Sequence, residues 1–275
     1  MLRTASALLL GALLGVANIR SAGAGVRVDP LHNDNGTYRV YFQDRLLGTE
    51  TFSLEPRGDS VLVFSSVDEQ IPTPMGDQKL AKKASLTIKT LDYDLLSYNS
   101  EQDFLGKKLV RGLSPGDTVF TTYRESSKVG SGDTYLRPPG RMFVIDSQVF
   151  VLFDVLLRSL HGKMFERPMS VCILGDPRDS VMEITCRPGA NETVPVQGRS
   201  RPAQRVLLTD GSNEFTAWVA SSGQMLRLDQ PAAGLRVERV NLTSKKVENP
   251  ALGPAVPSAA PGARISPSKP PAGKR

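Results

Sequence analysis

One stretch decides the fold: residues 146–162, DSQVFVLFDVLLRSLHG. An α-helix turns about 100° per residue, which places one set of apolar side chains on a single side: Val149, Leu152, Phe153, Leu156 and Leu160. Four more widen that side: Phe150, Val151, Val155 and Leu157. The segment is too short to cross a bilayer, which takes about 20 apolar residues. A helix that is apolar around most of its circumference is buried, so the rest of the chain is expected to enclose it.

The ends of this helix are marked by residues that commonly terminate helices. Asp146 or Ser147 is expected to cap its start by accepting a hydrogen bond from a free backbone N–H. Gly162 suits the left-handed residue that ends it. The apolar surface leaves only a narrow polar seam, formed by Asp154, Arg158 and His161.

The residues on either side of the helix indicate β-strands separated by turns. Strand-length runs with alternating or apolar patterns lie at 37–42, 46–54, 60–67, 80–91, 95–104, 107–111, 118–124, 135–144, 204–209, 214–219, 225–229 and 235–241. Short turns join many of them, so neighbouring strands are antiparallel. We therefore predict a mainly β protein: a large curved antiparallel sheet or half barrel with one buried central helix. Residues 187–202 are expected to form a loop.

Composition divides the chain into three parts. Residues 1–24 have Arg3, an apolar run and an Ala-x-Ala site at 22–24, which is typical of a cleaved secretory signal. Residues 26–245 are predicted to form one β-rich domain. Residues 246–275 are rich in Pro, Ala, Gly, Ser and Lys and predict a disordered basic tail. The expected location is the periplasm or the outside of the cell.

The net charge of +6 does not indicate a nucleic-acid groove. Arg3 and Arg20 contribute +2 and residues 245–275 contribute +5, which leaves −1 for the body. Nucleic-acid binding requires clustered Lys and Arg. The tail is a candidate for contact with an anionic envelope surface. The sequence does not indicate an oligomeric state.

The two cysteines are compatible with an exported protein. Cys172 and Cys186 lie in runs 168–174 and 180–186, which are expected to form a hairpin. A disulfide between them is predicted, since it would close a short loop in an oxidising compartment. No metal site is expected, because His32 and His161 are the only histidines that would supplement the thiols.

The two histidines do not indicate catalysis. The sequence contains no His-Glu-x-x-His zinc pair. Residues 130–133, GSGD, lack the Walker spacing and its Lys, so we interpret them as a hairpin turn. Asp68 and Glu69 are neighbours on a strand and point to opposite faces, which makes them a poor catalytic pair. We predict a protein that is not an enzyme and uses no cofactor.

Several short motifs occur in an order that resembles a known group. They are YRVYF at 38–42, LGTE at 47–50, LDYDLLSY at 91–98 and WVASSGQMLR at 218–227. This order resembles bacterial envelope proteins of unknown function whose sheets are similar to the lipoprotein-carrier half barrels. The resemblance implies a periplasmic module that handles a hydrophobic or lipidic ligand and has no known catalytic residues. This chain opens with strands, whereas those carriers open with a helix.

These observations predict an exported, non-catalytic protein that binds a hydrophobic or lipidic ligand between its helix and its sheet. The candidate ligand-binding residues are Phe150, Phe153, Leu157, Trp218, Tyr123, Asp154, Arg158 and His161, and Phe215, Tyr135 and Phe143 are further candidates for lining a cavity. The polar seam is either solvated or a hydrogen-bonded cluster that orients a ligand head group. The alternative function is a structural or partner-binding envelope protein with a fully packed core and no ligand cavity.

Overall fold

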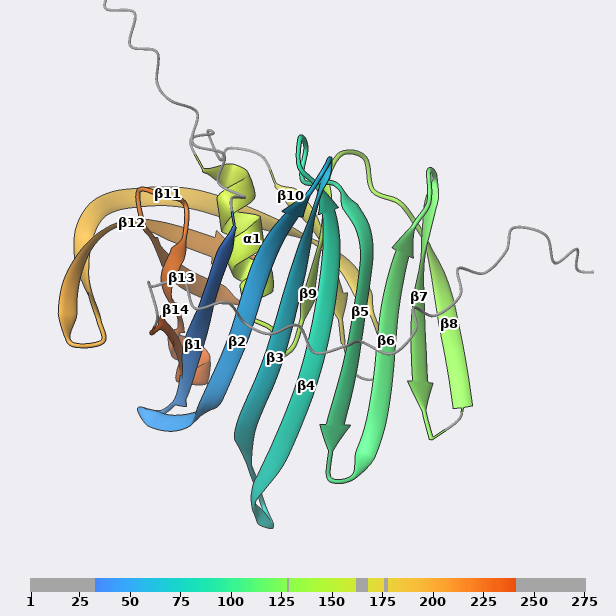
Figure 1. Cartoon of the computed structure of the whole chain (residues 1–275), viewed down its shortest axis with the longest axis horizontal. Coiled ribbons are helices and arrows are strands. Elements are labelled where there is room, and N and C mark those ends of the chain that lie inside the picture. The colour runs from blue at the N-terminus through green and yellow to red at the C-terminus, as the bar shows by residue number, and fades with distance from the viewer. Residues whose placement is uncertain (1–32, 128, 162–167, 176–177, 241–275) are drawn as a thin grey trace, which may run out of the picture.

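The computed structural model describes residues 33–127, 129–161, 168–175 and 178–240. The predicted signal at 1–24 and the basic tail at 246–275 lie outside these residues, and so does Gly162. All fifteen strands of the described residues lie in one sheet, in the order β8-β7-β6-β5-β4-β3-β2-β1-β15-β14-β13-β12-β11-β10-β9 (Figure 1). The predicted mainly β fold with one α-helix is confirmed.

The first eight strands form a meander in which each strand pairs with the next. They are β1 (Asp34–Phe42), β2 (Arg45–Arg57), β3 (Ser60–Thr73), β4 (Gly76–Lys89), β5 (Leu95–Phe104), β6 (Lys107–Pro115), β7 (Val119–Ser126) and β8 (Val129–Leu136). Short turns at 43–44, 58–59 and 74–75 connect the first four strands. Such turns require antiparallel pairing, as the sequence pattern indicates.

One crossover interrupts the antiparallel pattern. Strand β9 (Met142–Asp146) leads into α1 (Val151–Leu160), and the chain then returns as β10 (Met169–Leu174). Strands β9 and β10 pair in parallel, with Phe143 opposite Val171. A parallel pair requires a long connection, and α1 lies within it.

The last five strands complete the sheet and bring the chain back to its beginning. They are β11 (Ser180–Val196), β12 (Arg199–Thr209), β13 (Glu214–Val219), β14 (Met225–Gln230) and β15 (Leu235–Arg239), with a short 3-10 helix η1 (Pro231–Ala233) before β15. Strand β15 pairs with β1 in the middle of the sheet, where Val40 lies opposite Val237. The first and last described strands are therefore direct neighbours.

The sheet is strongly curved, and α1 lies on its concave side (Figure 1). Alternate side chains along each strand face inward. On β3 these are Val61, Val63 and Val67, each at most 2% exposed. Val61 and Val63 belong to one apolar core that also contains the apolar residues of α1. The terminal strand β9 contacts β5 across the concave side, yet the described strands do not close into a barrel.

The helix is shorter than the sequence pattern predicts. It begins after Phe150, whose side chain makes no capping hydrogen bond, and ends at Leu160. Neither Asp146 nor Ser147 is its N-cap residue: Asp146 is the last residue of β9 with a buried carboxylate, and Ser147 lies in the turn that follows. The apolar pattern continues across the junction because the end of β9 is itself buried, so periodicity does not separate the strand from the helix.

Two segments expected to be turns or loops are strands. Residues 187–202 form most of the long β11–β12 hairpin, which turns at Gln197-Gly198. Residues 130–133 lie within β8, where Gly132 pairs with Tyr123 of β7. Strands that are exposed, polar and rich in glycine resemble loops in composition.

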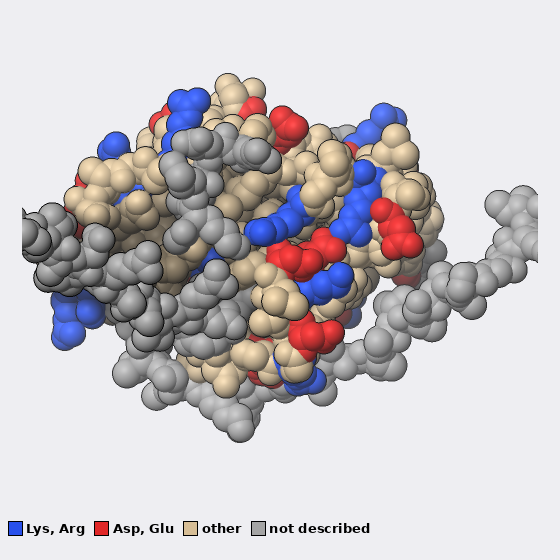
Figure 2. Space-filling model, turned by 90° about the horizontal axis from the view of Figure 1, so that it is seen from above, with Lys and Arg blue, Asp and Glu red and all other residues tan. Residues whose placement is uncertain are grey.

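The surface carries charges of both signs. Lys, Arg, Asp and Glu side chains are intermingled on the face seen from above (Figure 2). Exposed ion pairs of the surface include Arg45 with Asp77 and Lys79 with Asp68. Among the described residues, no helix has the length and apolar character needed to cross a membrane.

Candidate functional site

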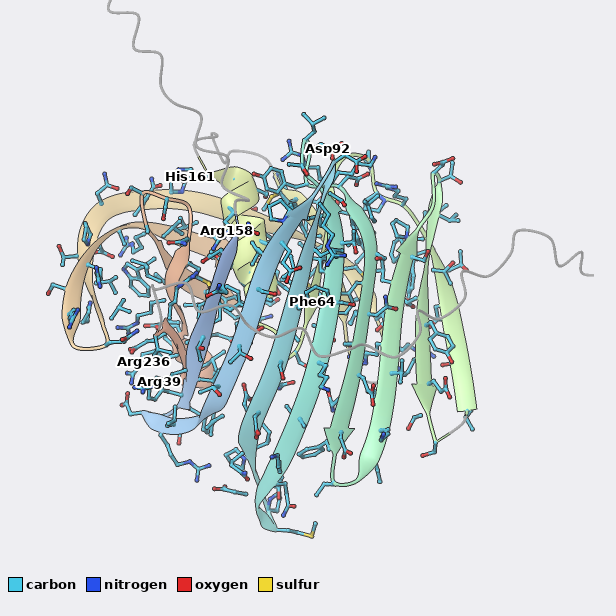
Figure 3. All side chains as sticks on the ribbon, in the orientation of Figure 1. Arg39, Phe64, Asp92, Arg158, His161 and Arg236 are labelled. Carbon is cyan, nitrogen blue, oxygen red and sulfur yellow. The ribbon has the colours of Figure 1, made fainter. Side chains whose placement is uncertain are left out.

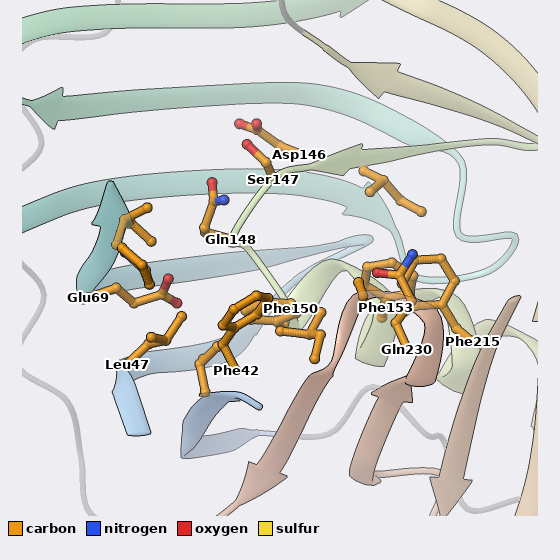
Figure 4. Close-up of a pocket in the computed structure, with 16 residues that line it drawn as sticks. Phe42, Leu47, Glu69, Asp146, Ser147, Gln148, Phe150, Phe153, Phe215 and Gln230 are labelled. Carbon is orange, nitrogen blue, oxygen red and sulfur yellow. The ribbon is translucent and has the colours of Figure 1, made fainter. Parts of the chain in front are cut away.

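A cavity of about 450 Å³ lies between the N-terminal end of α1 and the concave face of the sheet (Figure 4). Sixteen residues line it: Val40, Phe42, Leu47, Glu69, Ile71, Pro72, Ile145, Asp146, Ser147, Gln148, Phe150, Phe153, Phe215, Gln230, Ala233 and Leu235. Pro72, Ser147 and Ala233 are exposed, so the cavity opens to solvent. Its volume lies within the range of about 300–1,000 Å³ that is usual for small-molecule sites.

Aromatic side chains from three elements form much of the cavity wall. Phe150 immediately precedes the helix, Phe153 lies in its first turn, and Phe215 comes from β13. The rings of Phe153 and Phe215 are tilted by 44° and their centroids lie 5.3 Å apart. Phe42 at the end of β1 and Leu235 at the start of β15 continue the apolar surface. This wall suits an apolar ligand.

Glu69 places a carboxyl group inside this apolar wall. Its side chain lies on the inner face of β3 and is 1% exposed, whereas its neighbour Asp68 is exposed on the outer face. The Oε1 atom of Glu69 has no hydrogen-bond partner among the described residues. Burial raises the pKa of Glu69 to about 7, although the ammonium group of Lys82 opposes this shift. The opposite orientation of Asp68 and Glu69 agrees with the strand alternation.

The backbones of β2 and β3 lie unusually close together at Glu69. Gly48 of β2 pairs with Glu69 of β3. A Cβ atom at Gly48 would lie 2.1 Å from the backbone oxygen of Asp68 and 2.6 Å from the Cα of Glu69. Only glycine permits this approach of the two backbones.

Next to the cavity, the carboxylate of Asp146 is the centre of a buried polar network. Lys82 Nζ lies 2.6 Å from its Oδ1 atom, and Arg111 Nη1 lies 3.4 Å from the same atom. The hydroxyl groups of Tyr98 and Ser100 donate to Oδ2 at 2.8 and 2.9 Å. Lys82 also donates to the backbone oxygen of Ser147 at 2.9 Å. Burial lowers the pKa of Lys82, and the neighbouring carboxylate of Asp146 opposes that shift.

Glu50 of β2 caps the helix from a distant position in the sequence. Its Oε2 atom accepts a hydrogen bond from the backbone N–H of Phe150 at 2.8 Å, and both carboxyl oxygens accept from Val151 at 3.2 Å. Ser65 donates to the same carboxyl group at 2.6 Å. Burial raises the pKa of Glu50 to about 8, opposed by these hydrogen bonds. Glu50 thus satisfies the free N–H groups at the start of α1, which its own residues leave without a side-chain cap.

In the polar seam predicted on the helix, Asp154 and Arg158 are buried and His161 is half-buried, and none of the three lines the cavity. Asp154 and Arg158 are 0% exposed, and Asp154 Oδ2 lies 2.9 Å from Arg158 Nη2. The carboxylate of Asp34 bridges Arg158 and Arg239, the latter at 2.7 Å. Asp154 Oδ1 accepts the backbone N–H of Met225 at 2.7 Å. Figure 3 shows Arg158 beside β1 and His161 at the far end of the helix.

The other predicted site residues are distributed over the molecule. Phe150 and Phe153 line the cavity, whereas Leu157 is buried in the core away from the cavity lining. Trp218 packs on a second apolar cluster with Val194, Val196, Ala203 and Leu226, and its indole N–H donates to Glu192 at 2.6 Å. Tyr123 is 39% exposed and donates to Glu125. Of the further candidates, Phe215 lines the cavity, while Phe143 and Tyr135 belong to the core or pack against it.

The predicted disulfide is not formed. Cys172 and Cys186 are both free and buried. Cys172 pairs with Val181, and Cys186 lies five positions beyond it on β11, or about 16 Å at roughly 3.3 Å per residue. That separation is too long for a disulfide. Burial raises the pKa of both thiols to about 12, which makes them poor nucleophiles.

Three ionisable residues near the cavity were not predicted as site residues from the sequence: Glu50, Glu69 and Lys82. Each occupies an inward position of its strand, as the burial alternation shows. In the sequence, such a residue can be recognised as a charged residue at a position where the strand alternation places an apolar one. Glu69, two residues after Val67, is an example. This alternation shows which face of the sheet the charged side chain lies on. It does not show which residue of another strand or of the helix contacts it.

Comparisons with known proteins place few constraints on this chain. No model of a protein family matches it, and no curated protein matches it. It is similar to a solved structure of a DUF1089 family protein from Pseudomonas aeruginosa, with a TM-score of 0.42 and 11% sequence identity. The similarity covers 67% of this chain and 90% of that chain. A similarity this low assigns neither family nor function, and the resemblance to lipoprotein carriers stays a prediction.

The buried carboxyl group of Glu69 is expected to make stability depend on pH. Its folded-state pKa of about 7 lies above its ordinary value of 4.5, so the folded protein keeps a proton that the unfolded chain has lost. The free energy of unfolding therefore falls as pH rises from about 4.5 to 7, by at most about 1.4 kcal/mol per unit for this group. Glu50 acts in the same direction up to about pH 8. In urea titrations at several pH values, the free energy of unfolding of Glu69→Gln is expected to decrease less steeply with pH than that of the wild type.

The matched control for this measurement is Asp68→Asn. Asp68 is exposed on the outer face of the same strand. Its replacement is therefore expected to leave the pH dependence of the free energy of unfolding unchanged. The charged groups facing Glu69 are Lys82 on β4, Asp146 on β9 and Glu50 on β2, and all three remain in both variants. Equal slopes for the wild type and Glu69→Gln would show that Glu69 does not hold this proton.

Proposed function

We propose that this protein binds an elongated apolar ligand, such as an acyl chain, in the cavity between α1 and the sheet. The observation that carries the proposal is an open cavity of about 450 Å³ whose wall is formed largely by Phe42, Phe150, Phe153 and Phe215. Apolar surface in contact with water is unfavourable, by roughly 25 cal/mol per Å². A ligand chain in the cavity would remove this apolar wall from water.

The proposed role is binding without chemistry. Glu69 and Asp146 are the two titratable residues of the cavity wall. The carboxylate of Asp146 is held by Lys82, Tyr98 and Ser100, which leaves one carboxyl group facing the cavity without a partner for proton transfer. Acid–base catalysis on a bound substrate generally needs a positioned donor and acceptor. The proposed setting is the periplasm or the outside of the cell, in keeping with the signal pattern at residues 1–24.

Ala233→Phe is expected to weaken binding of an apolar probe. Ala233 is an exposed residue at the cavity mouth, so a benzyl group there narrows the entrance without disturbing the core. We expect the Kd of the neutral fluorescent probe N-phenyl-1-naphthylamine to rise by about tenfold, a loss of about 1.4 kcal/mol. Fluorescence titration measures this directly.

The matched control is Ala232→Phe, which adds the same group to the adjacent exposed residue of η1. Ala232 does not line the cavity, so binding is expected to be unchanged. Native mass spectrometry of the purified protein is expected to show a bound lipid-like mass, which Ala233→Phe reduces. If the probe binds the wild type and both variants equally, its binding site lies outside this cavity. If it binds none of the three proteins, the proposal is refuted.

A further inference from the structure

The cavity has a polar side whose chemistry restricts the ligand beyond its apolar body. We propose that the ligand carries a hydrogen-bond-donating head group without negative charge, a hydroxyl or an amine, and that the carboxyl group of Glu69 accepts its hydrogen bond. This inference rests on the proposed function, because it concerns the same cavity.

The first argument is the unfulfilled hydrogen-bonding capacity of Glu69. The side chain is 1% exposed and its Oε1 atom has no hydrogen-bond partner among the described residues. A buried polar oxygen without a partner costs about 1–3 kcal/mol, so such groups are rare unless another molecule completes them. The carboxyl group of Glu69 points into the cavity, toward Phe150 (Figure 4). A donor on a bound ligand would satisfy it.

The second argument is the sign of the charges around the cavity. Of the sixteen lining residues, two have carboxyl groups and none is basic. The nearby ammonium group of Lys82 already contacts Asp146 at 2.6 Å and donates to Ser147 at 2.9 Å. An anionic head group would meet the carboxyl groups of Glu69 and Asp146 without a free cation to balance them. Fatty-acid anions and phosphates are therefore disfavoured.

The third argument is the arrangement of polar and apolar residues along the cavity. Figure 4 shows Glu69 and Leu47 on one side, Phe153 and Phe215 on the other, and Phe150 between them. A single-chain amphiphile fits this arrangement with its head group at Glu69 and its chain directed toward Phe153 and Phe215. Such a pose buries the chain against aromatic surface and leaves one polar contact to fix its orientation.

The test compares three ligands that share a dodecyl chain: dodecylamine, 1-dodecanol and dodecanoate. Each is titrated below its aggregation concentration in competition with N-phenyl-1-naphthylamine at pH 8, against the wild type, Glu69→Gln and Asp68→Asn. The wild type is expected to bind the amine and the alcohol at least about tenfold more tightly than the carboxylate. Glu69→Gln is expected to remove most of the amine's advantage, whereas Asp68→Asn retains it.

A second measurement needs no variant and so does not depend on how Glu69→Gln folds. Burial places the pKa of Glu69 at about 7, while an alkylamine stays protonated up to about pH 10. Affinity of the wild type for dodecylamine is therefore expected to increase from pH 6 to pH 8, and affinity for 1-dodecanol to change less. Lys82, Asp146 and Glu50 are the charged groups that face Glu69 over this range.

The outcomes separate the two proposals. If dodecanoate binds as tightly as dodecylamine at pH 8, or if Glu69→Gln retains the wild-type preference, the head-group inference is overturned while apolar binding stands. If none of the probes binds the wild type, the proposed function itself fails. Both proposals are supported if the wild type prefers the amine and the alcohol over the carboxylate and Glu69→Gln loses this preference. The affinity of the wild type for the amine should also increase with pH.

Discussion

Replacement of Asp146 by Ala is expected to lower the free energy of unfolding by about 3–5 kcal/mol, because it leaves two buried cations without their shared carboxylate. Lys82 and Asp146 have side chains that are 1% and 0% exposed, and Arg111 is 8% exposed. Tyr98 and Ser100 would also lose the acceptor of their hydroxyl groups. Urea unfolding followed by circular dichroism measures the change.

The matched control for Asp146→Ala is Asp77→Ala. Asp77 also pairs with a cation, Arg45, but both side chains are about half exposed, at 46% and 50%. Removing an exposed pair is expected to cost at most about 1 kcal/mol. Similar losses for the two variants would mean that the Asp146 network contributes no more than a surface pair.

Replacement of Asp154 by Ala is expected to lower the free energy of unfolding by about 3–5 kcal/mol as well. This change removes one carboxylate partner of Arg158 and the acceptor of the Met225 backbone N–H, both inside the core. Asp34 remains as the carboxylate shared by Arg158 and Arg239. The charges of the cluster would then no longer balance in a region without water access.

A double variant distinguishes loss of charge balance from loss of packing. Asp154→Leu combined with Arg158→Met removes one charge of each sign and fills similar volume, so it is expected to cost less than Asp154→Ala alone. Asp44→Ala is the surface control, since Asp44 pairs with Arg236 but is 84% exposed. A double variant as unstable as the sum of its single changes would indicate that the two residues act independently.

The fold class was predictable because burial follows the period of each element. Residues on β3 alternate between inside and outside as the sequence pattern indicates, and the apolar residues of α1 are all buried. The boundary between β9 and α1 was not predictable, because both are apolar and Asp146, one of the two residues expected to cap the helix, instead pairs with Lys82. The long β11–β12 hairpin is polar and exposed along much of its length, which made it resemble a loop.

The candidate site was predictable only in its apolar part. Phe150, Phe153 and Phe215 follow from the apolar pattern and line the cavity. Its polar part depends on contacts between residues far apart in sequence, such as Glu50 with Phe150, which are separated by 100 positions. Asp154 and Arg158 were expected to be solvated or to face a ligand, and their burial follows from Asp34 and Arg239, which no local pattern associates with the helix.

The pairing of the first described strand with the last has a consequence for biosynthesis. Asp34 and Arg239 are 205 positions apart in sequence and lie 2.7 Å from each other. During translation, β1 is made early, and it can pair with β15 only when translation of the described region is nearly finished. Contacts of such long separation slow folding, because the intervening chain must first be brought together. The β1–β15 pairing therefore requires nearly all of the described chain to have been made, and until then β1 keeps an unpaired edge that other chains can approach.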